Sequence, residues 1–290
     1  MRSLAKKLVE RFLVSQPNFV NYLYFRVFGK ILQHVDHVVV DLPKTCILGH
    51  TGEKLRTRLD STLMRAVLSD FQWQLDEINF VTNSLKEGVN YDVIDVGANI
   101  GLFSLQLLNK VGGQIGNISC FEPDKRNFEC LVYNLDKWKS QVNLFNFGLG
   151  EMDEIKSLYI DYANSGNYSL MRSAMTNNLY TKEEVRISST LREMNELCKK
   201  SPLPLIWKSD TQGFDELILS QVPTAIWNRL HCGVIEIAGL PEVNFDQDLF
   251  SARLKEFNYI ALNGKVGNAE LLKELWRSKP SHHAELHFRR

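Results

Sequence analysis

The 290-residue sequence lacks features that mark several broad classes of protein. No apolar run reaches the roughly 18 residues that a membrane-spanning helix needs. Charged residues interrupt the segment that follows the N-terminal basic residues, so no signal peptide is predicted. The five cysteines form no CxxC pair, which favours reduced thiols and a cytosolic setting. Without an HxH or HExxH pattern, no metal site is predicted.

The sequence also lacks an excess of charge of either sign. Lysine plus arginine and aspartate plus glutamate number 34 each, so the formal net charge at pH 7 is zero. A protein without a global positive field is not drawn to nucleic acid or acidic lipid by bulk charge. We therefore expect no function that depends on such a field.

Residues 1–60 are predicted to form a helical extension and a lead-in to the main domain. Leu4, Leu8 and Phe12 recur at helical spacing, and the nearby basic residues lie mostly off that apolar stripe. Two interpretations remain open: a helix that packs on the main domain or a partner subunit, and an interfacial helix that touches a membrane. Residues 36–60 are expected to form a short strand pair and a loop.

Residues 61–290 are predicted to form one domain in which strands alternate with helices. Apolar, β-branched strands in such an alternation indicate a parallel sheet covered on both faces. The expected strands lie near 92–96, 117–121, 142–147, 204–209, 232–238, 258–263 and 284–288, and the expected helices within 61–87 and near 101–110, 125–137, 213–221, 246–257 and 268–277. The predicted fold class is thus α/β, with a doubly wound, seven-stranded, mostly parallel sheet. The long connection at about 150–200 is typical of a functional or a disordered insertion.

The stretch "VIDVGANIGLFSL" places a glycine-bearing turn between the first of these strands and its helix. A dinucleotide site would show GxGxxG, whereas this turn has the pattern D-x-G-x-N-x-G. Gly97 and Gly101 allow close approach of the backbone to a ligand, and the helix N-terminus offers N–H donors. Asp95 would repel a pyrophosphate and attract a cation. S-adenosylmethionine, which carries an ammonium and a sulfonium group, fits this turn best.

A second acidic residue supports an adenosine-containing cofactor. Glu122 ends the next strand, 21 residues past Gly101, in "FEPDKRNFECLVYNL". An acid at the end of the second strand is placed to accept hydrogen bonds from ribose hydroxyls. Alone this signal is weak, but its spacing from the first turn makes the combination specific.

Several blocks occur in an order that resembles the FkbM family of S-adenosylmethionine-dependent methyltransferases. They are "VIDVGANIGLFSL", "FEPDKRNFECLVYNL", "NFGLGEMDE", "GNYSL", "KSDTQGFDELIL" and "VIEI", within roughly residues 78–263. "KSDTQGFDELIL" is the most specific of them because it follows the family pattern K-x-D-x-[EQ]-G-[FYA]-[ED]. The resemblance implies a seven-stranded doubly wound sheet, S-adenosylmethionine as methyl donor and, usually, a hydroxyl acceptor on a sugar or a macrolide-type product.

The resemblance also implies roles for individual residues. It places cofactor contacts at Asp95, Gly97, Asn99 and Gly101, a ribose-binding acid at Glu122, and an adenine-bordering segment at Asn146 and Gly148. One departure is Arg192 in "STLRE", where the family often has an acid. The family's role for this position therefore does not carry over to Arg192, which suggests a change on the substrate side of the pocket.

Candidate catalytic residues lie near the ends of the fourth and fifth strands. Methyl transfer to a hydroxyl needs collinear reacting atoms and a base within about 2.6–3.2 Å of the hydroxyl. Asp210 is the first candidate for that base or for orienting the acceptor. Lys208, on the same face, would tether Asp210 or an anionic substrate, or form a structural ion pair with Asp210. Glu236 is the second candidate, ahead of His231 and His50.

Two further segments have weaker signals. "YANSGNYSL", within the insertion, is rich in Asn, Ser and Tyr, which hydrogen-bond polyol hydroxyls but also favour turns. The final "SHHAELHFRR" contains three histidines, for which a solvated tail or a last edge strand is favoured over a metal site.

The sequence therefore predicts a cytosolic S-adenosylmethionine-dependent O-methyltransferase acting on a sugar or glycan-like hydroxyl, with room for peripheral membrane contact through its N-terminal helix. The alternatives are methylation of a small natural product or an N-acceptor, and a methyltransferase-like scaffold without chemistry. The missing GxGxxG and Asp95 disfavour a nicotinamide-dependent dehydrogenase. Zero net charge and the lack of an N/D-P-P-Y block on the fourth strand disfavour nucleic-acid methylation, so no nucleic-acid partner is expected.

Overall fold

The computed structural model describes residues 39–43, 54–58, 74–161, 168–174, 180–238, 243–278 and 283–290. The predicted helix within residues 1–35 and the candidate His50 lie outside these residues. In the described part of the chain, no helix combines the length and the apolar character needed to cross a membrane.

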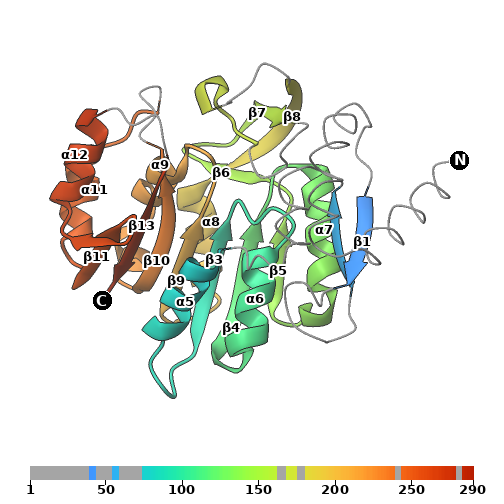
Figure 1. Cartoon of the computed structure of the whole chain (residues 1–290), viewed down its shortest axis with the longest axis horizontal. Helices are drawn as coiled ribbons and strands as arrows, with labels where there is room; N and C mark the ends of the chain where they lie inside the picture. The colour runs from blue at the N-terminus through green and yellow to red at the C-terminus, as the bar shows by residue number, and fades with distance from the viewer. Residues whose placement is uncertain are drawn as a thin grey trace, which may run out of the picture.

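A twisted eight-stranded sheet forms the middle layer of the described chain (Figure 1). Its spatial order is β12-β11-β13-β10-β9-β3-β4-β5. The strands are β3 (Tyr91–Val96), β4 (Ile115–Phe121), β5 (Val142–Phe145), β9 (Leu205–Ser209), β10 (Leu230–Ile237), β11 (Tyr259–Leu262), β12 (Lys265–Gly267) and β13 (Ala284–Arg289). Strands β3, β4, β5, β9 and β10 pair in parallel, and β13 lies antiparallel between β10 and β11. The strand order switches between β3 and β9, the place where open α/β sheets bind ligands.

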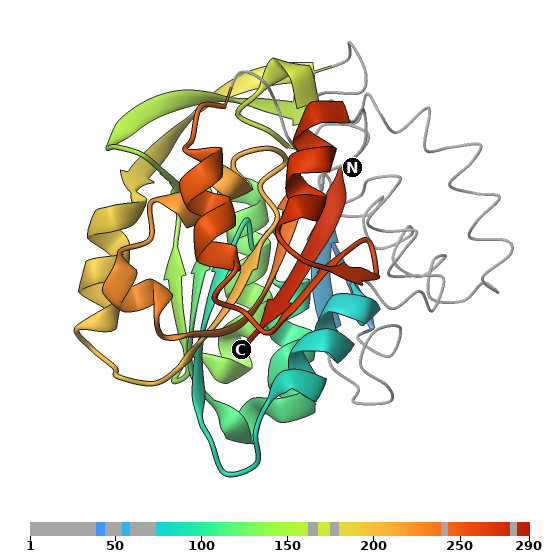
Figure 2. The same ribbon diagram turned by 90° about the vertical axis from the view of Figure 1, so that its left-hand side faces the viewer.

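Helices cover both faces of this sheet (Figures 1 and 2). One face carries α5 (Leu75–Ser84), α6 (Leu102–Val111) and α7 (Lys125–Leu135), and the other α8 (Thr190–Cys198), α9 (Asp215–Ser220), α10 (Thr224–Trp227), α11 (Gln247–Leu254) and α12 (Glu270–Ser278). Successive strand residues enter opposite layers, as Val93 and Ile94 do in β3. Burial on both sides explains why these strands are continuous apolar runs in the sequence.

The predicted α/β fold class is confirmed, and each of the seven expected strands is present. The eighth, β12, was not predicted; it forms a hairpin with β11 through Asn263 and Gly264, whose φ angles are 48° and 75°. The prediction of an edge strand or tail for the C-terminal residues was wrong. Strand β13 is interior because it pairs with β10 on one side and with β11 on the other, and its Leu286 and Phe288 side chains are fully buried.

The long connection predicted at about 150–200 contains a small second sheet of order β6-β8-β7. Its strands are β6 (Gly148–Gly150), β7 (Glu154–Asp161) and β8 (Tyr180–Ser189), and Arg172–Ala174 form a short 3₁₀ turn, η3. Leu158, Ile160, Val185 and Ile187 give this sheet its own apolar cluster. In Figure 1 it lies above the carboxyl ends of the central strands, so the insertion is placed to cover a site there.

The expected strand pair near the N-terminus is confirmed as β1 (Val39–Pro43) with β2 (Lys54–Arg58), paired antiparallel. Asn134 of α7 holds β2 as another strand would: it accepts from the Arg56 N–H at 2.7 Å and donates to the Arg56 carbonyl at 2.8 Å. Leu55 is buried beside this contact. The domain boundary predicted at residue 60 stays a prediction.

Candidate functional site

The β3–α6 turn has the backbone conformation that its glycines and asparagine suggested. Gly97, Asn99 and Gly101 have φ angles of 69°, 52° and 85°. A Cβ on Gly97 would lie 2.1 Å from the carbonyl oxygen of Asp210, and one on Gly101 would lie 2.7 Å from Leu131 of α7. Gly97 therefore allows the turn to meet the β9 loop, and Gly101 allows α6 and α7 to pack closely.

The N–H groups of this turn mostly fasten β3 to β4. The amides of Gly97 and Ala98 both donate to the Phe121 carbonyl at 3.0 Å, and the amide of Asn99 donates to the Glu122 carboxylate at 2.9 Å. These three groups precede α6, so the expectation that the helix N-terminus offers N–H donors to a ligand stays a prediction. The turn itself positions Glu122.

Asp95 and Lys208 form a buried ion pair beneath the turn. Their side chains are 0% and 5% exposed, and Lys208 Nζ lies 3.0 Å from Asp95 Oδ1 and donates to the Gly97 carbonyl at 2.9 Å. The Ser104 hydroxyl donates to the other Asp95 oxygen at 2.6 Å. The interpretations in which Asp95 faces a cationic ligand and Lys208 tethers Asp210 are thus wrong. Because β3 and β9 are adjacent and in register, Lys208 lies directly opposite Asp95.

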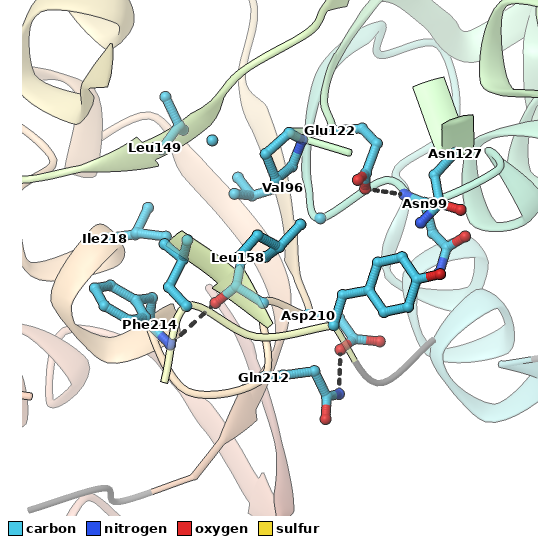
Figure 3. Close-up of a pocket in the computed structure, with 16 residues that line it drawn as sticks. Val96, Asn99, Glu122, Asn127, Leu149, Leu158, Asp210, Gln212, Phe214 and Ile218 are labelled. Carbon is cyan, nitrogen blue, oxygen red and sulfur yellow. Dashed lines mark hydrogen bonds between the residues drawn. The ribbon is translucent and has the colours of Figure 1, made fainter. Parts of the chain in front are cut away.

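Glu122 occupies the end of β4 as predicted and lines a cavity (Figure 3). It is 5% exposed, and its two oxygens accept from the backbone amides of Asn99 and Asp124 at 2.9 and 2.8 Å. Burial, and then the charge of Asp124, raise the pKa of Glu122 to about 8. Each carboxylate oxygen keeps a second lone pair for a further donor.

The cavity opens to solvent, and the free space within it, open solvent included, is about 570 Å³. Its wall combines the β3 turn and the ends of β4 and β9 with the insertion. The lining residues are Val96, Gly97, Asn99, Glu122, Pro123, Asn127, Gly148, Leu149, Leu158, Tyr168, Leu170, Asp210, Thr211, Gln212, Phe214 and Ile218. Asp95, Gly101 and Asn146 are not among them.

Asn146 and Gly148 have different places at the site: Asn146 supports the end of β4, and Gly148 lines the cavity. The Asn146 amide donates to the carbonyls of Glu122 and Pro123 at 2.9 and 3.3 Å, so it holds the β4 end from outside the cavity. Gly148 lines the cavity, where an added Cβ would lie 2.9 Å from Ile187.

Asp210 lines the cavity and is held by two glutamines. Gln212 Nε2 donates to its Oδ1 at 2.9 Å, and Gln74, at the start of α5, donates to its Oδ2 at 3.4 Å. Behind it, Asp215 accepts from the Thr211 amide and hydroxyl; burial, and then the charge of Asp210, raise the pKa of Asp215 to about 6. Asp210 is thus a carboxylate in fixed orientation at the cavity wall.

Glu236 does not line the cavity but joins Asp210 through Gln212. The same Gln212 Nε2 donates to Glu236 Oε2 at 2.8 Å, and His283 Nδ1 lies 2.9 Å from Glu236 Oε1. Sequence reasoning missed His283, because nothing in the sequence places the start of the last strand beside β10. It also missed Gln74, which belongs to a segment without a motif.

Two other candidates lie away from the cavity. His231, at the start of β10, is 7% exposed; its Nε2 lies 2.7 Å from the Ser84 carbonyl and its ring packs on Tyr91. Arg192 is half-exposed on α8 and pairs with Asp153 and Glu193. The suggestion that Arg192 changes the substrate side of the pocket is therefore wrong. Among the described residues, no group of metal-ligating side chains comes together.

The insertion contributes directly to the site. Ser169, fully buried, donates to the Gln212 carbonyl at 2.7 Å, and Tyr168 and Leu170 on either side line the cavity. Gln212 has a left-handed backbone with φ of 55°, which this contact helps to hold. Tyr168, Ser169 and Leu170, the described end of the segment for which polyol binding and a turn were both open, thus lie at the site.

No protein-family model matches the chain, and the search of curated proteins finds no match. Solved structures do resemble it. An FkbM methyltransferase from Methylobacillus flagellatus is 14% identical with a TM-score of 0.42, over 79% of this chain and 53% of the other, so the chain spans about half its length. A precorrin-6y C5,15-methyltransferase from Geobacter metallireducens is 11% identical with a TM-score of 0.36, over 76% and 88% of the two chains. An rRNA methylase from Streptococcus thermophilus is 10% identical with a TM-score of 0.36, over 74% and 94%.

The strand order and the glycine turn give the chain a Rossmann-like fold of the methyltransferase type. The prediction that it has no nucleic-acid partner is corrected, because structures of this fold that resemble it include an rRNA methylase. Net charge was the wrong criterion: a balanced total says nothing of how charge is distributed over one face.

Proposed function

We propose that this chain is an S-adenosylmethionine-dependent methyltransferase of the FkbM family that methylates a hydroxyl of a sugar or glycan-like acceptor. The observation that carries the proposal is that Glu122 and Asp210, from different strand ends, line one cavity. Glu122 is suited to a ribose, and Asp210 to an acceptor hydroxyl.

The hydrogen-bond acceptors and apolar side chains in one half of the cavity support the proposal that a cofactor binds there. Two donating ribose hydroxyls would favour the ionised form of Glu122, which accepts them with the lone pairs that Asn99 and Asp124 leave free. Apolar side chains such as Leu149 and Ile218 suit an adenine ring. When bound, S-adenosylmethionine supplies the electrophilic methyl group.

Asp210 supports the proposal that the acceptor binds in the other half of the cavity. Gln212 and Gln74 hold both of its oxygens, so the carboxylate has a fixed direction in which to accept the hydroxyl proton. Much of the rate of an in-line displacement comes from such positioning. Tyr168 and Leu170 of the insertion cover the cavity and would exclude water from it.

Calorimetric titration with S-adenosylhomocysteine tests the cofactor assignment. Glu122→Ala should weaken binding at least about tenfold, about 1.4 kcal/mol, while Glu129→Ala, at an exposed position of α7, should leave it unchanged. A well-folded wild type that does not bind S-adenosylhomocysteine would overturn the proposed function.

Transfer of a labelled methyl group tests the acceptor. Separate reactions would contain glycan precursors, RNA and small polyhydroxylated natural products. The proposal expects label in the glycan, retained after alkali treatment as a methyl ether and insensitive to nuclease. Asp210→Asn should remove most of this transfer, while Asp248→Asn, whose side chain is 91% exposed on α11, should not. Label confined to RNA or to a small product would refute the glycan acceptor.

A further inference from the structure

A chain of polar side chains runs from the C-terminal strand to the cavity wall. His283, just before β13, contacts Glu236 of β10, and Glu236 contacts Gln212 in the loop after β9. Gln212 lines the cavity, and its single amide nitrogen also donates to Asp210. Both N–H bonds of that amide are therefore committed, one to each carboxylate.

This arrangement works only while Glu236 accepts hydrogen bonds at the oxygen that faces Gln212. A protonated oxygen there would donate, and the Gln212 amide would then turn to present its carbonyl. His283 prevents this, because its Nδ1 lies at the far oxygen of Glu236, at 2.9 Å, and holds the carboxyl in one orientation. The Gln212 backbone is held separately, by the hydrogen bond from Ser169 to its carbonyl. The contact with Glu236 therefore determines only the orientation of the Gln212 side-chain amide.

The groups that face this pair are mostly acidic. Asp210 and Asp215 act on both Glu236 and His283, and Glu285 follows on β13, opposite Glu236. Burial, and then Asp210, raise the pKa of Glu236 to about 8, which the hydrogen bond from His283 opposes. The hydrogen bond with Glu236 in turn raises the pKa of His283. The pair thus retains a proton at neutral pH and adds no net charge beside Asp210.

We propose that His283 is a positioning residue of the methyl-transfer site, which acts through Glu236 and Gln212 to orient Asp210 and to keep a proton at the acceptor side of the cavity. This inference rests on the proposed function. It assigns to the last strand a role in the site that the sequence did not indicate.

Sinefungin provides a probe that needs no acceptor, because it has an amine where S-adenosylmethionine has its sulfonium methyl. The ratio of its affinity to that of S-adenosylhomocysteine therefore reports the charge and orientation of groups at the acceptor side. We would measure both affinities by calorimetry from about pH 6 to about pH 8.5. The proteins are wild type, His283→Ala and His283→Asn, whose amide can still donate to Glu236 but cannot hold the proton.

In the wild type, the ratio should rise at least about threefold across this range, as the pair loses its proton and the site becomes more negative. His283→Ala should lower the ratio at pH 6 at least about threefold, because a Gln212 amide turned by protonated Glu236 no longer orients Asp210. It should also reduce the rise, because Glu236 alone keeps its proton to higher pH and only groups such as Asp215 still titrate in this range. His283→Asn should restore the ratio at pH 6 but not the rise. At each pH, the two variants should bind S-adenosylhomocysteine within about twofold of the wild type, since no cofactor contact involves His283.

An unchanged ratio and pH dependence in folded His283→Ala would overturn the inference. So would failure of His283→Asn to restore the ratio at pH 6, because the hydrogen bond would then not carry the effect. Neither outcome affects the proposed function, which fails only if the wild type does not bind S-adenosylhomocysteine.

Discussion

Replacement of Lys208 by methionine should destabilise the protein strongly, although the side chain lies outside the cavity. Lys208 lies 3.0 Å from Asp95 and donates to the Gly97 carbonyl, with both charged side chains almost fully buried. Burial alone would lower the pKa of Lys208, but Asp95 and Asp210 raise it, so the lysine is charged at neutral pH. Removing one partner of a buried pair leaves an uncompensated charge, which costs about 3–5 kcal/mol.

Urea unfolding followed by tryptophan fluorescence measures this cost, since Trp207 and Trp227 are fully buried. The double variant Asp95→Asn/Lys208→Met removes both charges and keeps an acceptor for Ser104. Its free energy of unfolding should exceed the additive expectation from the two single variants by about 1–3 kcal/mol. Additive effects, or a loss below about 1 kcal/mol for Lys208→Met, would refute the ion pair as the anchor of the turn.

Three further predictions concern single side chains. Gly97→Ala should weaken S-adenosylhomocysteine binding at least about tenfold by calorimetry, because its φ is positive and the added Cβ would meet the Asp210 carbonyl; unchanged affinity would contradict the close approach. The pKa of Glu122, raised from 4.5 to about 8, means that the folded state binds more protons between those values, so stability falls as pH rises through them. Glu122→Gln should flatten that fall in thermal unfolding, and an unaltered slope would argue against a buried, protonated Glu122. His231→Phe should cost about 1–3 kcal/mol of unfolding free energy, by leaving the Ser84 carbonyl unpaired, without changing cofactor affinity; a loss of affinity would return His231 to the site.

The sequence allowed the fold to be predicted because each strand and helix has a local signal. Strands buried on both faces are continuous apolar runs, and the helices between them end near glycine or polar residues. Strand β12 was missed because its three residues are exposed and carry no apolar pattern. The interior position of β13 depends on partners distant in sequence, so a short alternating segment did not reveal it.

Sequence reasoning could identify candidate residues that directly follow a strand end. It could not identify contacts between side chains on two different strands. Glu122 and Asp210 follow strand ends that meet at one edge of a parallel sheet, and both line the cavity. The expected tether between Lys208 and Asp210 came from pairing within one strand, and Asp95 was expected to face a ligand because no partner for it was in view. The register of β3 with β9, which sequence spacing does not contain, makes Lys208 the partner of Asp95.

The proposed cofactor end and the proposed acceptor end of the cavity are built in different ways. At the cofactor end, Glu122 is held by the backbone of its own and the adjacent turn, so its place follows from local sequence. At the acceptor end, the Gln212 loop is held by Ser169 from the insertion and through Glu236 by His283 from the last strand. A change of C-terminal sequence would therefore alter the acceptor end while leaving the cofactor end intact. Such a division suits a fold in which one methyl donor serves different acceptors.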